Sequence, residues 1–212
     1  MKLYTYFRSS AAYRTRIALN LKEVPYESVP VDLRPAAHRQ PDYLARNPQG
    51  LIPALEDGAT VIGQSLAIIE YLEETQPQPP LLPRSPIDRA RVRSIALAIA
   101  CDIHPLNNLR VLNYLRSPLG HDETAVDAWY RHWIAEGFRA LEEEAKRASG
   151  DGRHMFGADV TLADICLVPQ MFNARRLKCN VEPFPTLVAI CAHLETVPAF
   201  ARAAPAAQPD AS

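Results

Sequence analysis

The segment Arg8-Ser9-Ser10-Ala11-Ala12-Tyr13-Arg14 places hydroxyl and guanidinium groups where an expected strand gives way to an expected helix. The first amides of a helix have no intrahelical acceptor and, together with the helix dipole, they favour an anion. The same field lowers the pKa of a thiol bound there. The segment therefore predicts an anion or thiolate site, although an ordinary helix cap flanked by solvated arginines explains the same residues.

A second group of polar residues flanks two expected strands. Gln49-Gly50-Leu51-Ile52-Pro53 precedes one of them, and Gln64-Ser65 follows the other at the start of a helix. Few X-Pro bonds are cis, so the residues by themselves favour a trans bond before Pro53. If that bond were cis, the Ile52 backbone would be turned outward and could pair with an extended peptide. Ser65 would then offer its amide and hydroxyl to a carboxylate.

A third group combines His104, Asn108 and Arg110 with the pair Arg175-Arg176. His104 and Asn108 are four residues apart, so within one helix they would share a face. Arginine keeps its charge and pairs with carboxylates in a bidentate manner, which suits an acidic ligand. A structural histidine and solvated helix arginines explain the same residues, and both interpretations stay open at this point.

The composition argues against several classes of function. With 23 Lys and Arg against 24 Asp and Glu, the net charge of −1 does not favour general nucleic-acid binding. No apolar stretch approaches the roughly 18 residues of a membrane span, and no motif for a protein nucleophile or a metal is present. The cysteines show no metal or redox spacing: Cys101, Cys166, Cys179 and Cys191. Since no signal-peptide pattern is seen either, we expect a cytoplasmic protein without membrane, nucleic-acid or metal partners.

The first part of the chain mixes strands and helices. Alternating apolar residues predict strands over 2–7, 26–33, 53–56 and 60–62. Apolar residues at four-residue spacing predict helices from Ser9 or Ser10 to Lys22 and from Ser65 to Thr75, and one or two helical turns are expected within 35–47. The dipeptide Asp57-Gly58 predicts the turn between the last two strands. The order βαβ followed by ββα indicates a small α/β unit.

Residues 77–86 hold five prolines in ten positions, which neither a helix nor a central strand tolerates, so they predict an extended linker. After the linker the pattern is helical. We expect helices over 87–116 with a kink at Pro105, over 124–148, from Thr161 onward, and over 185–195, with a frayed tail over 203–212. Thr161 and Asp164 predict a capping box at the start of the third of these helices.

Taken together, these segments resemble the glutathione transferase superfamily, and within it the zeta class. The resemblance covers nearly the whole chain and rests on the proline linker, the Thr161–Asp164 box and the motifs at 6–10, 13–19, 104–110 and 173–176. It implies an α/β thioredoxin-like, glutathione-binding domain over 1–80 and an all-helical, substrate-binding domain over 87–212.

The resemblance also implies a homodimer with glutathione as cofactor. It implies that the glutathione sulfur lies near Ser9, Ser10 and Ala11. The bond before Pro53 would be cis, with Ile52 pairing to the cysteinyl backbone of glutathione, and Gln64 and Ser65 would bind its γ-glutamyl end. His38 and Gln49 would lie near the cofactor, and His104 and Asn108 would line the cofactor and substrate cleft. Many zeta enzymes carry a cysteine where this chain has Ala11. A protein thiol at that position is therefore not required, and the side reactions of that cysteine are in doubt.

The implied reaction is glutathione-dependent cis–trans isomerisation, converting maleylpyruvate to fumarylpyruvate in gentisate-type breakdown of aromatic compounds. A thiolate adds to the carbon β to the ketone, the bond rotates in the enolate, and the thiolate leaves from the trans isomer. Because the cofactor supplies the nucleophile, the protein needs none. We expect Ser9 to donate to the thiolate, and the arginines to bind the substrate carboxylates and the enolate: Arg8, Arg110 and Arg176.

Three alternatives remain. A maleylacetoacetate isomerase acts on a substrate one methylene longer, and a pocket discriminates one methylene by only about 1–3 kcal/mol. A broad glutathione-conjugating transferase is disfavoured by the arginines, because apolar electrophiles gain nothing from three cations. A non-enzymatic interaction module on the same fold would not bind glutathione.

Overall fold

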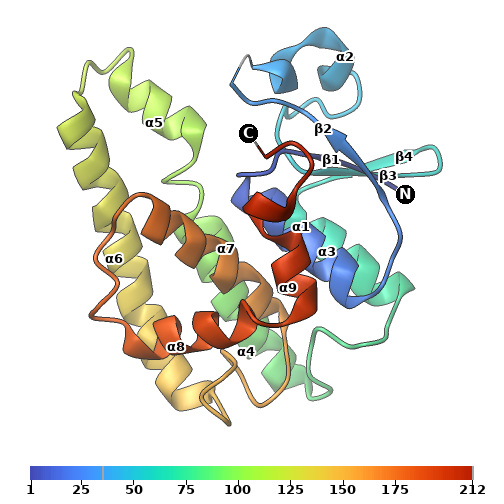
Figure 1. Cartoon of the computed structure of the whole chain (residues 1–212), viewed down its shortest axis with the longest axis vertical. Coiled ribbons are helices and arrows are strands. Elements are labelled where there is room, and N and C mark those ends of the chain that lie inside the picture. The colour runs from blue at the N-terminus through green and yellow to red at the C-terminus, as the bar shows by residue number, and fades with distance from the viewer. Residues whose placement is uncertain (35, 212) are drawn as a thin grey trace. The chain divides into compact units, whose positions relative to one another are not determined.

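The computed structural model describes residues 1–34 and 36–211. Pro35, which begins the segment expected to hold one or two helical turns, and Ser212, the end of the expected tail, lie outside the described residues. The chain forms two units, one made of residues 1–80 and 196–212 and the other of residues 81–195, and Figure 1 labels their elements. Within the described residues, none of the helices combines the length and apolar character that crossing a bilayer requires.

The first unit is built on a mixed sheet of four strands in the order β2-β1-β3-β4. The strands are β1 (Lys2–Thr5), β2 (Glu27–Pro30), β3 (Ala54–Asp57) and β4 (Thr60–Gly63). β1 pairs parallel with β2 and antiparallel with β3, and β3 pairs antiparallel with β4. Gly58, at φ +58°, supplies the left-handed residue of the tight turn between β3 and β4. The four expected strands are confirmed, with shorter ends for the first two.

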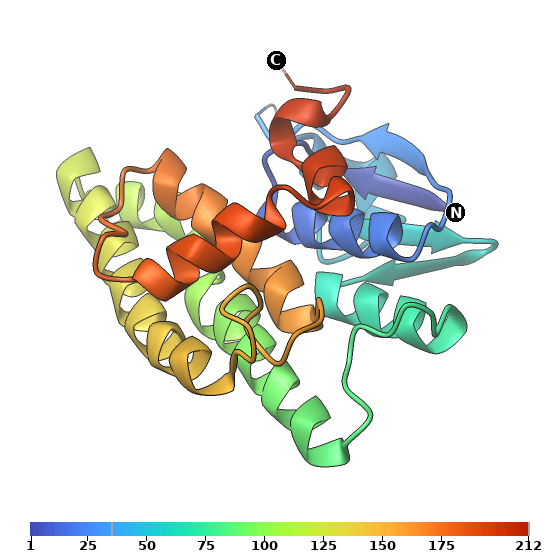
Figure 2. The same ribbon diagram turned by 60° about the horizontal axis from the view of Figure 1, so that its bottom comes forward.

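Helices cover both faces of this sheet. α1 (Ser10–Leu21) and α3 (Ser65–Thr75) pack against each other, and Figure 2 shows them along one side of the sheet. On the other face, η1 (Ala37–Arg39) and α2 (Pro41–Leu44) pack over a buried cluster that includes Tyr4, Val31 and Tyr43. This arrangement confirms the thioredoxin-like domain and the helical turns expected after residue 35.

The C-terminal segment belongs to the first unit. α9 (Pro198–Ala203) packs on α1, where the Asn20 side chain donates to the Ala199 carbonyl across 3.0 Å, and η3 (Pro205–Ala207) follows. The expected frayed tail is wrong over 203–211, because Ala203 and Pro205 are buried there. For the same reason, the helical unit ends at residue 195 instead of continuing to 212 as the expected second domain does.

The second unit consists of helices. They are α4 (Pro86–Leu97), η2, a π-helical turn (Ala98–Ile103), α5 (Leu109–Arg116), α6 (Glu123–Ala148), α7 (Leu162–Arg176) and α8 (Pro185–Leu194). α4 packs on α7 and α6 packs on α8, and the interior is apolar, with Ile99, Phe138 and Leu167 fully buried. The expected all-helical part of the chain is confirmed.

The single kinked helix expected over 87–116 is wrong. The chain is helical as far as η2, passes through a turn at 104–107, and begins a new helix capped by Asn108, whose side chain accepts from the Arg110 amide across 3.1 Å. Proline lacks an amide proton and its ring clashes with the preceding turn. Pro105 therefore coincides with a complete break.

The capping box at the start of α7 is confirmed. The fully buried carboxylate of Asp164 accepts from the Thr161 amide across 2.8 Å and from the Thr161 hydroxyl across 2.9 Å. Its other oxygen accepts from the Met155 amide across 2.7 Å. One side chain thus fixes both the first turn of α7 and the loop before it.

Candidate functional site

Ser9 caps α1, where it ends the connection from β1. Its backbone is extended, and its Oγ accepts from the Ala12 amide across 3.2 Å. Because Oγ is the acceptor in that bond, the hydroxyl proton remains available to a ligand. Ser9 is half-buried and lies at the positive end of the helix dipole. A hydroxyl donor in this place suits a thiolate or another anion.

Arg8 lies next to Ser9 and is exposed. Its Nη2 donates to the Tyr6 hydroxyl across 3.1 Å, and the guanidinium carbon lies 5.0 Å from the centroid of the Phe7 ring. Tyr6 and Phe7 meet edge to face at 4.8 Å. The guanidinium therefore rests on an aromatic pair, which restricts its orientation while leaving it accessible to a carboxylate.

The connection from β1 to α1, residues 6–9, is called the corner below. Arg16 lies behind it and is fully buried. Its Nη2 donates to the Phe7 carbonyl across 2.9 Å, and its Nε donates to the Ala203 carbonyl across 3.0 Å. The Phe7 amide in turn donates to Asp210 Oδ2 across 2.9 Å. Neither of these charged residues is among those expected to form the site. Arg16 follows Tyr13 by three residues on the buried helix face, which is a usable signal, whereas Asp210 has none.

Gln49 and Gln64 come together as expected for two residues of one ligand site. Both are exposed, and Gln64 Nε2 donates to Gln49 Oε1 across 2.8 Å. The Ile52–Pro53 bond is cis, which confirms the implication of the family resemblance and overturns the expectation from base rates alone. Ser65 does not cap α3: it is the first helical residue, and Gln64, at φ +66°, takes the cap position.

Several contacts hold the loop that carries Gln49. The Leu51 carbonyl accepts from the Tyr43 hydroxyl across 2.7 Å and from Asn47 Nδ2 across 2.8 Å. Gly50 has φ +57°, and a Cβ there would lie 3.0 Å from the His38 carbonyl, so a larger residue does not fit. His38 itself is half-buried, which lowers its pKa. The loop is therefore fixed before any ligand arrives.

Ser65 is held from inside the first unit. The buried guanidinium of Arg14 donates to Ser65 Oγ across 3.4 Å. Ser65 is itself buried, at 6% exposure, and its amide belongs to the first turn of α3, where amides lack intrahelical acceptors. This second helix N-terminus can bind a carboxylate, as the sequence predicts.

In the second unit, the expected shared helix face of His104 and Asn108 is wrong. His104 follows the end of η2 and Asn108 begins α5, so the turn of 104–107 separates their two helices. Both residues are half-buried, and Arg110 is exposed in the first turn of α5. The three side chains therefore belong to one connection between helices.

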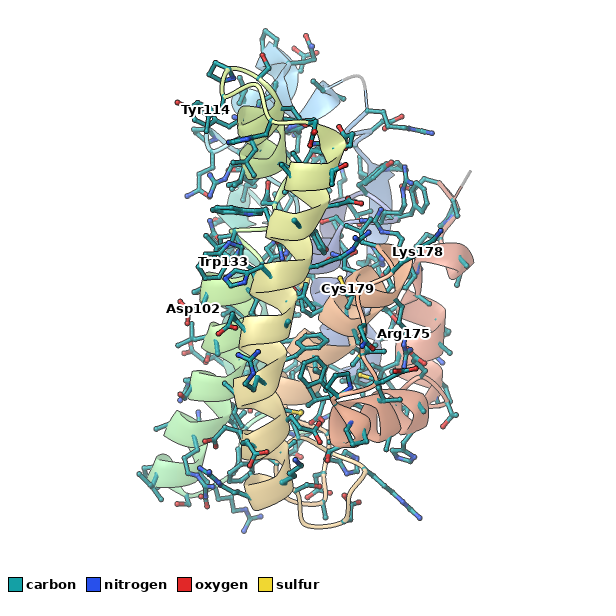
Figure 3. The ribbon with its side chains drawn as sticks, turned by 90° about the vertical axis from the view of Figure 1, so that its left-hand side faces the viewer. Asp102, Tyr114, Trp133, Arg175, Lys178 and Cys179 are labelled. Atoms are coloured by element: carbon teal, nitrogen blue, oxygen red, sulfur yellow. The ribbon has the colours of Figure 1, made fainter. Side chains whose placement is uncertain are left out.

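Arg175 and Arg176 differ in their surroundings at the end of α7. Both side chains are exposed, but Arg175 pairs with Glu195 Oε1 across 2.7 Å. Figure 3 shows Arg175 and Cys179 on one flank of this unit and Trp133 and Asp102 on the other. The Arg176 charge acts on the buried Tyr130 phenol, opposing the rise in pKa that burial causes. Arg176 is thus the member of the pair whose guanidinium remains available to donate to a ligand's carboxylate.

The chemistry of these groups matches a thiol-containing peptide better than a metal. Among residues 1–34 and 36–211, no group of three or more His, Cys, Asp or Glu side chains could hold a metal ion. Ser9 and the start of α1 suit a thiolate, and Gln49, Gln64 and Ser65 suit the polar end of a peptide. Because Ala11 carries no thiol, a nucleophilic sulfur at the corner has to come from the ligand.

Comparison with known proteins supports this assignment. Residues 8–75 match the family model of the glutathione S-transferase N-terminal domain. The chain is 50% identical to a maleylpyruvate isomerase of a Ralstonia species, with all of both chains covered. It is 49% identical to a probable maleylacetoacetate isomerase of Vibrio cholerae, with 99% of this chain and 97% of that protein covered.

Solved structures are also similar over the full length. A holo structure of a bacterial maleylpyruvate isomerase, described as a zeta-class glutathione S-transferase, has a TM-score of 0.98 at 50% identity, with 100% of both chains covered. A maleylacetoacetate isomerase of Methylobacterium extorquens, with bound malonate and glutathione, has a TM-score of 0.96 at 41% identity, again with 100% of both chains covered.

Proposed function

The chain belongs to the zeta class of glutathione transferases, and on that premise we propose that it is a glutathione-dependent isomerase that converts maleylpyruvate to fumarylpyruvate. One structural observation carries the proposal: an accessible guanidinium, Arg8, directly precedes the helix-capping hydroxyl of Ser9. A donor for a thiolate and a cation for a carboxylate are thus neighbours in the chain.

Glutathione, when bound, supplies the thiolate nucleophile that this chain lacks at the corner. The Ser9 hydroxyl donates a hydrogen bond to the thiolate sulfur, and Ser10 and Ala11 surround that sulfur. Gln64 and Ser65 hold the γ-glutamyl end of glutathione with help from Gln49. Ile52, beside Pro53, pairs with the cysteinyl backbone, and His38 lies near the cofactor. The 2.8 Å bond between Gln49 and Gln64 supports this assignment because it sets the two amides toward one another.

The substrate is a dicarboxylate, and we assign its acid groups to Arg8, Arg110 and Arg176. All three arginines are exposed, and each presents a fork of donors that matches a carboxylate. They also stabilise the negative charge that develops on the substrate oxygen during isomerisation. We also assign His104 and Asn108 to cofactor and substrate binding, as the family resemblance implies. The malonate in the Methylobacterium extorquens structure is a dicarboxylate bound with glutathione by a relative.

Maleylacetoacetate is the second candidate substrate, because a relative named for it is nearly as similar, at 49% identity, as the one named for maleylpyruvate, at 50%. The arginines disfavour a general conjugating transferase, whose apolar electrophiles would leave their charge unmatched. We further propose a homodimer that works in the cytoplasm in the breakdown of aromatic compounds, as the family resemblance implies.

The test is an assay of the purified protein with maleylpyruvate and with maleylacetoacetate, each with and without glutathione. We expect loss of the maleyl absorbance only when glutathione is present, with the higher kcat/KM for maleylpyruvate. Turnover without any thiol would overturn the mechanism. A higher kcat/KM for maleylacetoacetate would move the assignment to the second candidate, and a protein that does not bind glutathione would be an interaction module instead.

A further inference from the structure

The backbone of Phe7 is held by two charged side chains, one nine residues further along the chain in α1 and the other 203 residues away in the C-terminal segment. Its amide donates to Asp210 Oδ2 across 2.9 Å, and its carbonyl accepts from Arg16 Nη2 across 2.9 Å. Arg16 also binds the Thr5 hydroxyl and the Tyr6 carbonyl, at 3.0 and 3.4 Å. The residues between β1 and Ser9 are therefore fixed by one guanidinium and one carboxylate.

Arg16 is completely buried, yet every acceptor that the structure gives it within residues 1–34 and 36–211 is neutral: Thr5, Tyr6, Phe7 and Ala203. Burial lowers its pKa to about 10, and the Asp210 charge opposes that shift. The Tyr13 ring adds a cation–π contact, with its centroid 5.5 Å from the guanidinium carbon. A buried guanidinium is costly unless its donors are satisfied, so these bonds have to form together.

The C-terminal segment supplies two of these contacts. Arg16 Nε donates to the Ala203 carbonyl at the end of α9, and seven residues later Asp210 accepts from Phe7. Asp210 Oδ1 is buried and has no hydrogen-bond partner among the described residues. Since a buried polar atom without a partner is costly, the hydrogen bond that the other oxygen accepts from Phe7 is the contact that gives Asp210 its role here.

We propose that Asp210 and Arg16 are positioning residues for the isomerase reaction, acting through the Phe7 backbone to aim Ser9 at the glutathione sulfur and Arg8 at a substrate carboxylate. The inference rests on the proposed function. Neither residue touches glutathione or substrate; each fixes the chain that carries the groups that do. Preorganised donors stabilise charge only when their geometry is held before the reaction begins.

The test compares Asp210→Ala, Asp210→Asn and the matched control Asn20→Ala. The Asn20 side chain also ties α1 to the C-terminal segment, through Ala199, but it does not contact Phe7. Three readouts are measured: hydrogen exchange of the amides of residues 7–12 in the ligand-free protein, the pKa of bound glutathione from its thiolate absorbance, and kcat and KM separately. Arg16→Lys, which keeps the charge but loses the fork of donors, is the second variant.

We expect Asp210→Ala to speed exchange at Phe7, to raise the thiol pKa of bound glutathione, and to lower kcat by about ten- to a hundredfold, because small displacements of reacting groups have effects of that size. Asp210→Asn should recover most of the loss, since its amide oxygen still accepts from Phe7. Arg16→Lys should shift all three readouts in the direction of Asp210→Ala, and Asn20→Ala should leave the thiol pKa and kcat as in the wild type.

Unchanged exchange and thiol pKa in Asp210→Ala would overturn the inference, as would an equal loss in Asn20→Ala, which would mean a general structural role. These results differ from failure of the proposed function. A wild-type protein that binds no glutathione overturns both, whereas a wild type that binds glutathione without isomerising maleylpyruvate overturns only the assigned reaction, because the exchange and thiol pKa still report on the corner.

Discussion

The side-chain amide of Gln64 donates to the side-chain carbonyl of Gln49 across 2.8 Å, which joins the loop before β3 to the start of α3. The two residues come from separate segments of the first unit, and each segment is fixed independently. Tyr43 and Asn47 hold the first through Leu51, and Arg14 holds the second through Ser65. The pair therefore presents its remaining polar atoms to a ligand in a set orientation.

Gln64→Ala should weaken glutathione binding by about 1 kcal/mol, close to the value of one neutral hydrogen bond. Gln49→Ala should also weaken glutathione binding, but by less, because Gln49 assists mainly by orienting the Gln64 side chain through their hydrogen bond. The double variant should lose less than the sum of the two single losses, since the residues are bonded. Calorimetric titration with glutathione measures all three; additive losses would contradict the shared role.

Ser9 combines a cap with a thiolate donor, and two substitutions separate these roles. Ser9→Ala should lower the free energy of unfolding by about 1 kcal/mol, whereas Ser9→Gly should cost only a few tenths. Both remove the hydroxyl, so both should raise the thiol pKa of bound glutathione and lower kcat to a similar extent. Chemical unfolding and thiolate titration give the two measurements. If kcat fell in Ser9→Ala but not in Ser9→Gly, in parallel with the loss of stability, Ser9 would act only as a helix cap.

Arg176→Ala should raise KM for maleylpyruvate and lower kcat/KM by about ten- to a hundredfold, the range for losing a charge-assisted hydrogen bond. Glutathione affinity should stay the same. Arg175→Ala is the matched control because it removes the neighbouring charge and its ion pair with Glu195. That pair is partly exposed and contributes about 0–1 kcal/mol to stability, so the kinetics should not change. Equal kinetic effects in both variants would refute the assignment.

Asp164 gives a prediction about pH. Burial raises the pKa of its carboxyl from 3.8 to about 6, outweighing the hydrogen bonds from Met155 and Thr161. A carboxyl whose pKa is higher in the folded protein binds its proton more tightly there, so its contribution to the free energy of unfolding falls as pH rises through this interval.

Asp164→Asn should remove that pH dependence. It should also place an amide group against backbone donors, which lowers the free energy of unfolding by about 1–3 kcal/mol. The stability difference from the wild type should therefore be larger near the low end of the interval than above its high end. Urea unfolding over a pH series measures it. The exposed loop residue Asp159 offers the control Asp159→Asn, and a difference for Asp164→Asn that grows with rising pH would contradict the prediction.

Gly137 lies where α6 and η2 pack closely. A Cβ at this position would overlap the Ile103 side chain, so Gly137→Ala should lower stability by about 1–3 kcal/mol despite the better helix propensity of alanine. Ile103→Ala should cost about 2–5 kcal/mol by leaving a cavity. The double variant should lose less than the two combined, since the new methyl group enters the vacated space. Thermal unfolding tests this, and additive losses would disprove the close approach.

Local patterns in the sequence were enough for most of the fold. The four strands, a start of α1 at Ser9 or Ser10, the proline-rich linker and the Thr161–Asp164 box were predicted because each depends on residues only a few positions apart. The family resemblance added the cis bond before Pro53, which the local composition argued against.

Only the tertiary structure decided the features that depend on distant residues. The Phe7 amide finds its acceptor at Asp210, and Arg16 finds one at Ala203, in contacts that leave no periodic trace in the chain. The same holds for the ordered C-terminal segment. The break at Pro105 was visible as a proline, but whether the helix would bend or end depended on the Asn108 cap and the packing around η2. Periodicity records which face of an element is buried, whereas the partner that buries it is set by how the whole chain folds back on itself.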